Sequence, residues 1–210
     1  MIRVLIVDDH PVVRKGLLQI LMEEPDIAPA VEAETAAEML RLVREEEWDM
    51  IVLDITLPDR SGLEALKDVK AMRPSLPVLI LSMHPEDQYA LRVLRAGAAG
   101  YMSKDSASEE LVNAVRKVVG GGRYVSPSMA EKLAAVIGSD YEKPPHENLS
   151  DREFQVMCMI ASGKRLKEVA EELCLSVKTV STYRARILEK MGMENNAELT
   201  YYAIKNGLVE

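Results

Sequence analysis

The chain has 210 residues, of which 48% are hydrophobic and 29% charged, an ordinary globular composition with enough length for two domains. No apolar run approaches the ~18 residues of a membrane span, and the first residues lack the basic and apolar regions of a signal peptide. The two cysteines, Cys158 and Cys174, have no metal-binding spacing and are interpreted as core residues in a reducing compartment. We therefore expect a cytoplasmic protein with no membrane partner.

The net charge of −8 argues against a nucleic-acid partner for the chain as a whole, because phosphate binding needs cations. Residues 147–210, however, hold 9 Lys+Arg and 10 Asp+Glu, so most of the negative charge lies in residues 1–146. Within the C-terminal part, the segment from Lys178 to Lys190 carries four cations against the single acid Glu189. One locally basic helix is therefore predicted in an otherwise acidic protein.

From the N-terminus, short β-rich runs alternate with amphipathic stretches over the first 120 residues. Aliphatic runs without alternation predict strands buried on both faces at Ile2–Val7, Ala28–Ala33, Met50–Asp54, Val78–Ser82 and Gly100–Ser103. Apolar residues at helical spacing predict helices at Val12–Glu24, Ala36–Glu46, Leu63–Met72, Asp87–Ala96 and Glu109–Val119. Five βα units in series predict an α/β fold, a doubly wound five-stranded parallel sheet of flavodoxin-like type, for the domain 1–120.

Residues 121–147 are predicted to be a linker that contains a short helix, Pro127–Ile137. The domain 148–210 that follows is predicted to be a small all-α unit. Ser150 and Glu153 form an S-x-x-E capping box at its start. Its four expected helices are Asp151–Ser162, Leu166–Leu173, Val177–Met191 and Asn196–Asn206.

Four predicted strands end on residues that can handle a phosphoryl group. The first strand runs into Asp8 and Asp9, the third ends on Asp54, and the fourth and fifth end at Ser82 and Lys104. In a parallel sheet all strand carboxyl ends lie along one edge, which is where open α/β sheets bind ligands. The pattern therefore predicts a Mg²⁺-dependent phosphorylation site.

Mg²⁺ prefers oxygen ligands from one or two carboxylates, waters and phosphates. Asp9 and Asp54 can supply the carboxylates, Asp8 can hold a coordinated water, and the backbone carbonyl near Thr56 can complete the set. His10 is interpreted as a residue that packs at the start of the first helix, because the other histidines show no ligand spacing. The predicted metal site therefore consists of oxygen ligands.

Asp54 is the candidate nucleophile, because a carboxylate that is ionised at pH 7 can attack phosphorus and form an acyl phosphate. Lys104 would neutralise charge on the transferred group, and the Ser82 hydroxyl would donate a hydrogen bond to it.

These residues resemble the receiver domain of two-component response regulators over about residues 1–120. The motifs that carry the resemblance are Ile6-Val7-Asp8-Asp9-His10, Leu53-Asp54, Leu81-Ser82 and Gly100-Tyr101-Met102-Ser103-Lys104. The resemblance implies that Asp54 accepts phosphate from a phosphohistidine on a sensor histidine kinase. It also implies that Ser82 and Tyr101 form the switch, the hydroxyl moving to the phosphoryl group and the ring rotating inward behind it. One position departs from many receivers, since Asp105 follows the lysine where they have proline.

The sequence leaves two interpretations for two residues near the predicted phosphorylation site. His84 and Thr56 lie two residues after Ser82 and Asp54, at positions that in receivers line the approach of hydrolytic water. They either set the lifetime of the phosphorylated state or are ordinary loop residues.

The C-terminal unit resembles the LuxR-type helix-turn-helix through Leu149–Glu153, Gly163-Lys164, Glu168–Ala170 and Leu175–Val180. The resemblance implies that the third helix enters the major groove of DNA. At 100° per residue its apolar stripe, which must face the core, contains Val177, Val180, Ile187, Leu188 and Met191. The predicted DNA contacts, cations for phosphates or base edges and small residues that let the helix approach, are Lys178, Thr179, Ser181, Thr182, Ala185, Arg186 and Lys190.

The sequence leaves two interpretations for each of two residues of the third helix. Arg184 lies near the apolar stripe, so it either lies along the core and pairs with an acid or touches DNA. Tyr183 is either an edge of the core or a phosphate donor.

The whole-chain pattern is similar to the NarL/FixJ class of response regulators, and Cys174-Leu175-Ser176 through Tyr183-Arg184 is similar to its GacA/UvrY-type members. We therefore predict a transcription regulator that is switched by phosphorylation and binds double-stranded DNA, with RNA polymerase as a further candidate partner. Surplus apolar residues on the fourth helix fit a homodimer of the phosphorylated form. No enzyme activity is expected beyond Mg²⁺-dependent self-phosphorylation and slow self-dephosphorylation.

Two competing interpretations come from other classes of protein. An aspartate-nucleophile phosphohydrolase would carry two acids as D-x-D after its first strand, whereas Asp8 and Asp9 are adjacent and the candidate nucleophile lies on the third strand. A phospho-dependent protein-interaction module, with a helical unit that binds protein, is the other.

Overall fold

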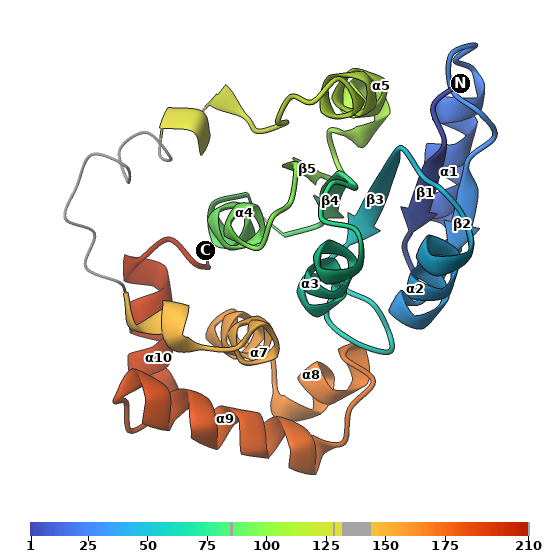
Figure 1. Ribbon diagram of the computed structural model, residues 1–210. Helices are drawn as coiled ribbons and strands as arrows, with labels where there is room; N and C mark the ends of the chain where they lie inside the picture. The colour runs from blue at the N-terminus through green and yellow to red at the C-terminus, as the bar shows by residue number, and fades with distance from the viewer. Residues whose placement is uncertain (85, 128, 132–143, 210) are drawn as a thin grey trace. The chain divides into compact units, whose positions relative to one another are not determined.

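The structure is a computed structural model that describes residues 1–84, 86–127, 129–131 and 144–209 (Figure 1). The chain divides into two compact units, residues 1–135 and 136–210. Most of the predicted helix Pro127–Ile137 lies outside the described residues. Within the described part of the chain, no helix is both long and apolar enough to cross a bilayer.

The first unit contains a five-stranded parallel sheet in the order β2-β1-β3-β4-β5, which confirms the predicted α/β fold. Its strands are β1 (Val4–Val7), β2 (Val31–Ala33), β3 (Met50–Asp54), β4 (Val78–Ser82) and β5 (Gly100–Ser103). Its helices are α1 (Pro11–Met22), α2 (Ala36–Glu45), α3 (Gly62–Met72), α4 (Glu86–Arg95) and α5 (Ala107–Val119). The order reverses between β1 and β3, and the carboxyl ends of strands at such a point are where open α/β sheets bind ligands.

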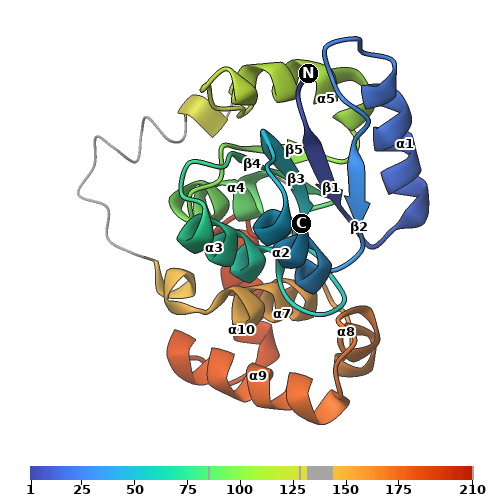
Figure 2. The ribbon, with the colours of Figure 1, turned by 45° about the vertical axis from the view of Figure 1, so that its right-hand side comes forward.

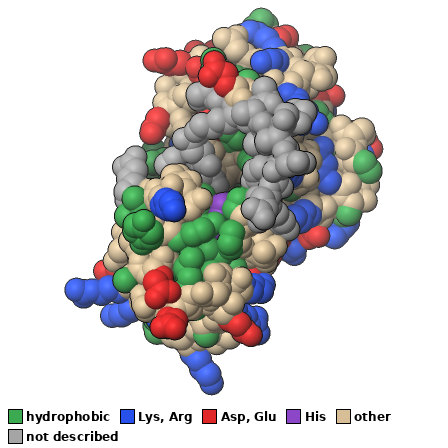
Figure 3. All heavy atoms as spheres, turned by 90° about the vertical axis from the view of Figure 1, so that its left-hand side faces the viewer, with side chains coloured by type: hydrophobic (Ala, Val, Ile, Leu, Met, Phe, Trp, Pro, Cys, Tyr) green, Lys and Arg blue, Asp and Glu red, His purple; other side chains and the backbone are tan. Residues whose placement is uncertain are grey.

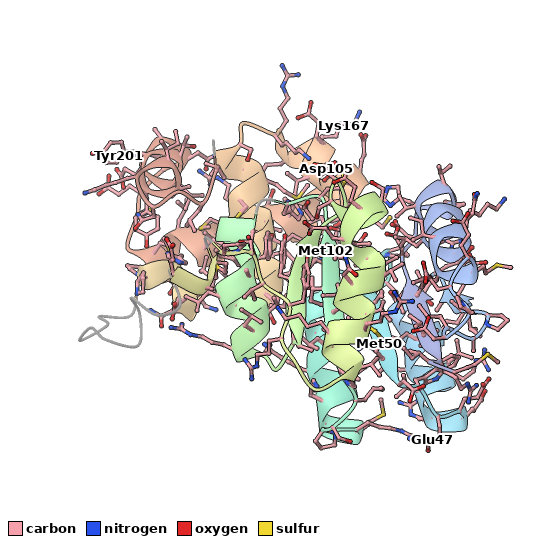
Figure 4. All side chains as sticks on the ribbon, turned by 90° about the horizontal axis from the view of Figure 1, so that it is seen from above. Glu47, Met50, Met102, Asp105, Lys167 and Tyr201 are labelled. Carbon is pink, nitrogen blue, oxygen red and sulfur yellow. The ribbon has the colours of Figure 1, made fainter. Side chains whose placement is uncertain are left out.

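Helices cover both faces of this sheet, as the uninterrupted aliphatic runs predict. Every residue of β1, β3 and β4 is buried. Figures 1 and 2 show α1 and α5 on one face and α2, α3 and α4 on the other. Met50 and Met102, labelled in Figure 4, belong to the core that the sheet shares with α1 and α5. The buried sheet provides a rigid support for the side chains at its edge.

The connection from β3 to α3 is held by main-chain contacts at its two ends. The Gly62 N–H donates to the Ile55 carbonyl at 2.7 Å, and Thr56 bridges to Ser61. Asp59, between them, accepts hydrogen bonds from the first two N–H groups of α2 at 3.0 and 2.9 Å. This loop begins directly after Asp54, so its geometry fixes the surroundings of that carboxylate.

The second unit consists of η1 (Pro145–Asn148), α7 (Asp151–Ala161), α8 (Leu166–Glu172), α9 (Val177–Met191) and α10 (Asn196–Lys205). The predicted capping box is present: Ser150 accepts from the Glu153 N–H, and the Glu153 carboxylate accepts from the Ser150 N–H. Gly192 ends α9 in the left-handed region at φ 65°, where a side chain would be strained. The four predicted helices are therefore confirmed to within a residue or two.

Several element ends differ from the sequence prediction by one or two residues, as at β1, which begins at Val4 rather than Ile2. Two features differ more. The second strand is shorter than Ala28–Ala33, because only Val31–Ala33 pairs with β1, and Ile27 makes an isolated bridge to Ile2. The 3-10 turn η1 forms where the sequence indicates linker, since Pro145 at its first position is pre-set for a helical turn.

Gly62→Ala should lower the free energy of unfolding by about 1–3 kcal/mol, as overpacked sites do. An added Cβ would lie 2.1 Å from the Asp54 carbonyl oxygen and 2.8 Å from the Ile55 Cα, and neither backbone atom can move independently. Gly16→Ala is the matched control, because this helical glycine is exposed with no atom within 4 Å of the new Cβ. We expect it to stabilise the protein by about 0.5–1 kcal/mol. Urea unfolding of the two variants measures both effects, and equal stabilities would contradict the assigned packing.

Candidate functional site

The parallel register brings the four predicted strand ends to one edge of the sheet. Val7 pairs with Leu53, so Asp8 follows β1 beside Asp54 at the end of β3. Ser82 pairs with Ser103, the residue before Lys104. The predicted phosphorylation residues therefore lie at adjacent strand ends.

Lys104 lies between two carboxylates at this edge. Its Nζ atom is 2.6 Å from Asp8 Oδ2 and 2.7 Å from Asp54 Oδ2. All three side chains are buried, with exposed fractions of 6%, 2% and 3% in that order. Burying charge is costly unless it is paired, and two carboxylates share one ammonium here. The cluster therefore retains excess negative charge.

The electrostatics of the cluster shift the pKa of two of its members. Burial raises the pKa of Asp54 to about 6, an effect that Lys104 opposes and the charge of Asp8 reinforces. Burial acts to lower the pKa of Lys104, but the two carboxylates outweigh it and hold that pKa above its usual value. At pH 7 the cluster therefore contains the Asp54 carboxylate, the form that can act as a nucleophile, next to an ammonium.

The acids also fit a divalent cation. Asp8, Asp9, His10 and Asp54 each place one ligand atom so that the four atoms lie within 4.8 Å of one another. Asp9 Oδ1 is buried and accepts no hydrogen bond from the described residues, although His10 Nδ1 lies 2.6 Å from it. Carboxylate oxygens gathered within this distance are the ligands that a hard cation prefers, so these residues fit Mg²⁺. The Thr56 N–H donates to Asp54 Oδ1 at 3.2 Å, so the residue whose carbonyl is the predicted main-chain ligand lies beside the Asp54 carboxylate.

The His10 ring does not pack against the start of α1 as the sequence suggests. Its side chain is 61% exposed and lies on the carboxylates, 2.6 Å from Asp9 and 3.3 Å from Asp8. Its backbone N–H also donates to Asp8 at 2.8 Å. An acidic cluster attracts a neighbouring imidazole, and a single sequence gives no sign of that orientation.

The two candidate switch residues lie side by side in the buried part of this edge. Ser82 is buried, and its hydroxyl accepts a hydrogen bond from the His84 N–H at 3.1 Å. Tyr101 is only 1% exposed, and its hydroxyl donates to the His84 carbonyl at 2.6 Å. Burial raises the pKa of Tyr101, so the phenol stays protonated and can act as a donor. In this structure the Tyr101 ring is in the inward position.

Arg14 is a residue of the site that the sequence reasoning missed. Its guanidinium is buried and donates to the Asp8 carbonyl at 2.7 Å, to Glu32 at 3.0 Å and to Glu34 at 2.5 Å. It therefore ties the Asp8 main chain to β2 and the residue after it. A detectable signal existed, since Arg14 shares helical spacing with the core residues Leu17 and Leu21, and a cation on an apolar stripe needs a buried partner.

The helix α9 separates an apolar face from a polar one. Val180, Ile187, Leu188 and Met191 are buried as predicted, but Val177 is 47% exposed, because it is the first residue of the helix and lies beyond the core. The predicted contact residues Lys178, Ser181, Thr182, Ala185 and Arg186 are all exposed, and Thr179 is partly buried. Their side chains form one exposed face that carries two cations.

Polar contacts lie at both ends of this face and on the packed side of α9. Ser176 caps α9 by accepting from the Thr179 N–H at 3.0 Å, and their hydroxyls lie 2.8 Å apart. Lys190, a predicted DNA contact, donates to the Glu153 carboxylate at 2.6 Å, so a phosphate would have to compete with that ion pair. Arg184 donates to Asn196 of α10 at 2.6 Å, which places it along the packed side of the helix, paired with an amide rather than an acid.

Comparison with known families assigns both units. Residues 4–116 match the response regulator receiver domain, and residues 147–203 match the bacterial regulatory proteins of the luxR family. The chain therefore belongs to the response regulators of the LuxR family, with a receiver domain and a DNA-binding domain.

Relatives share this arrangement over their whole length. The response regulator GacA of Pseudomonas aeruginosa is 37% identical, with 100% of this chain and 99% of the relative covered. UvrY of Escherichia coli K12 is also 37% identical, covering 99% of this chain and 96% of the relative. Among solved structures, Salmonella typhimurium RcsB is 25% identical with a TM-score of 0.59, covering 97% of this chain and 98% of that chain. The predicted class of regulator is confirmed.

Asp54→Asn should raise the free energy of unfolding at pH 7 in metal-free buffer, by up to about 3 kcal/mol, because one pKa unit corresponds to about 1.4 kcal/mol. The folded-state pKa of about 6 lies above the ordinary 3.8, so the native state binds more protons between these values. Wild-type stability should therefore fall as the pH rises from about 4 to about 6, and the variant should lose this dependence.

Urea unfolding at a series of pH values in the presence of a chelator measures this difference. Asp105→Asn is the control, since Asp105 is exposed on the loop that follows Lys104. An Asp54→Asn variant less stable than the wild type at pH 7 would contradict the electrostatic account.

Proposed function

We propose that Asp54 accepts a phosphoryl group from a phosphohistidine of a sensor histidine kinase in a Mg²⁺-dependent reaction. The observation that carries this assignment is the buried Asp54 carboxylate, 2.7 Å from Lys104 in a cluster with excess negative charge. Mg²⁺, held by Asp8, Asp9, Asp54 and the Thr56 carbonyl, would neutralise charge on the phosphoryl oxygens.

The protein residues then carry the transfer. An Asp54 oxygen forms the new bond to phosphorus, the bond to the histidine nitrogen breaks, and that nitrogen keeps its electron pair. The Lys104 ammonium lies where the phosphoryl charge arrives and can exchange part of its carboxylate pairing for it. The same site would lose its phosphoryl group slowly to water, with Thr56 and His84 beside the path.

The phosphoryl group would then bias the position of Ser82 and Tyr101. The Ser82 hydroxyl accepts from the His84 N–H, and it also carries a proton that it can donate to a phosphoryl oxygen. Movement of that hydroxyl would favour the inward Tyr101 ring, whose own hydroxyl is bonded to the His84 carbonyl. Such a two-state element turns a local charge into a change of shape.

We assign residues 1–120 to the receiver, 121–147 to the linker and 148–210 to the DNA-binding domain, acting in the cytoplasm where the chromosome lies. Helix α9 would present Lys178, Thr179, Ser181, Thr182, Ala185 and Arg186 to the major groove. Lys190 would join them once released from Glu153. An RcsB structure at 25% identity and a TM-score of 0.60 is bound to promoter DNA in the presence of a phosphomimetic, which supports the link between the two sites.

A homodimer is proposed for the phosphorylated, DNA-bound form. On α10, Tyr201 is 70% exposed and Ile204 53% exposed. Figure 3 shows hydrophobic side chains gathered on this face of the helical unit, and Figure 4 shows Tyr201 at its periphery. A second copy related by two-fold symmetry would cover this surface and read an inverted repeat. RcsB is described as dimers on DNA. RNA polymerase would be contacted from a surface that the dimer leaves free.

Asp54→Asn should abolish labelling by a phosphodonor and the Mg²⁺-dependent addition of beryllofluoride. The amide is not a nucleophile for phosphorus, and it removes one metal ligand. Phosphate-affinity gel mobility and mass spectrometry measure the labelling, with Asp105→Asn as a variant that should still be labelled. Because Asp54→Asn should be at least as stable as the wild type, loss of labelling cannot result from unfolding. Labelling of the Asp54→Asn variant would show that Asp54 is not the phosphorylation site.

The double variant Lys178→Ala plus Arg186→Ala should weaken binding to duplex DNA and reduce the salt dependence of the binding constant by about one phosphate contact per cation. Titrations at several salt concentrations, with a bound genomic fragment as probe, measure the slope. Lys205→Ala is the control, since Lys205 is an exposed cation of α10 in the same unit. An unchanged slope in the double variant would exclude α9 as the DNA-binding helix.

A further inference from the structure

The segment that follows α5 returns along the outer edge of β5. The Tyr124 N–H donates to the Ala99 carbonyl, and the Tyr101 N–H donates to the Tyr124 carbonyl, both at 3.0 Å. The pairing makes a parallel bridge between Gly100 and Tyr124. The first part of the predicted linker, residues 122–127, is therefore hydrogen-bonded to the strand that carries Tyr101.

Gly100 makes this approach possible. A Cβ at that position would lie 2.3 Å from the Tyr124 carbonyl oxygen and 2.8 Å from the Tyr124 Cβ. The Tyr124 side chain is held separately, with its hydroxyl bonded to Glu110 and its ring 5.9 Å from the Lys117 Nζ. The absence of a side chain at Gly100 thus lets the main chain of Tyr124 approach the edge of β5.

A second attachment joins the same segment to the start of α4. The Ser126 N–H donates to Glu86 at 3.2 Å, and the Ser126 hydroxyl donates to the other oxygen of the same carboxylate. Ser126 also begins a helical turn, because its hydroxyl and carbonyl accept from the N–H groups of Met129 at 3.1 Å and Ala130 at 3.0 Å. Glu86 therefore holds the residue from which the linker turns into helix.

These contacts meet at the candidate switch. Tyr101 is bonded through its main chain to Tyr124 and through its hydroxyl to the carbonyl of His84, two residues before Glu86. The linker thus contacts both elements that the Tyr101 ring connects, β5 and the β4–α4 loop. A change in the position of that ring would change how β5, which bonds Tyr124, lies relative to Glu86, which bonds Ser126.

We infer that the edge of β5 and the start of α4 form a docking surface for residues 122–127 of the chain's own linker, and that this surface holds the linker more tightly when the Tyr101 ring is inward. The inference rests on the proposed phosphorylation of Asp54, since phosphorylation would favour the inward ring. Phosphorylation of the receiver would thereby determine whether residues 122–127 are held or released. These residues begin the linker to the DNA-binding domain. In this structure the Tyr101 ring is inward and the hydrogen bonds from Ser126 to Glu86 are formed.

Amide hydrogen exchange of the full-length protein tests the inference, with and without beryllofluoride and Mg²⁺. The additive should slow exchange in peptides spanning residues 122–131 by about fivefold or more, the low end of allosteric couplings. Ser126→Ala and Glu86→Gln should each remove most of that gain. Glu64→Gln is the matched control, because Glu64 also lies in the first turn of a receiver helix, is exposed and has no linker contact among the described residues.

Fluorine NMR of bound beryllofluoride separates the possible failures. Beryllofluoride that binds without slowing exchange at residues 122–131 overturns the docking inference and leaves the phosphorylation site standing. The docking inference is equally wrong if Ser126→Ala and Glu86→Gln keep the full gain. Absence of beryllofluoride binding to the wild type overturns the proposed function and the inference with it. Gly100→Ala gives a further check, since it should raise exchange at residues 122–127 in both states.

Discussion

The ammonium of Lys104 between the carboxylates of Asp8 and Asp54 is the interaction on which the receiver unit depends. One cation cannot neutralise two buried anions. Burial raises the pKa of Asp54, Lys104 opposes that effect, and the charge of Asp8 reinforces it. The arrangement is electrostatically unfavourable by itself, and the buried strands β1 and β3 hold it in place. A divalent cation can relieve this stress by neutralising the carboxylates, whereas a phosphoryl group on Asp54 would add negative charge and compete with the acids for Lys104.

Main-chain geometry around the cluster keeps it rigid. Gly62 lets α3 begin against the Asp54 carbonyl, Asp59 fixes the loop to α2, and Arg14 holds the Asp8 carbonyl from the other side. The contacts of Gly62 and Arg14 reach the main-chain carbonyls of Asp54 and Asp8 rather than their carboxylates, and Asp59 anchors the loop through its own carboxylate. The support therefore positions the acids without neutralising them, which a site that must bind a cation requires.

The sequence predicts the sheet and its edge because both depend on local patterns. Aliphatic runs define the strands, and the parallel topology then brings Asp8, Asp54 and Lys104 together without further information. The sequence does not predict contacts that depend on three-dimensional packing. Arg14 meets Glu32 only after β2 is placed, and the bridge from Tyr124 reaches β5 from a segment that carries no strand pattern. Helical periodicity likewise cannot tell that Val177 lies beyond the end of the core.

The scale of these interactions is sufficient for the proposed control of the DNA-binding domain by a small change at the sheet edge. Allosteric couplings need only about 1–3 kcal/mol, which is the worth of one or two hydrogen bonds to charged groups. The Tyr101 hydroxyl bond to His84 and the two bonds from Ser126 to the Glu86 carboxylate are of that order. In the proposed mechanism Tyr101 belongs to the switch and Ser126 to the linker, and no long pathway would be needed between them. One loop and one strand, the β4–α4 loop and β5, lie between Asp54 and the linker. Phosphorylation as proposed would strengthen or break a contact of each.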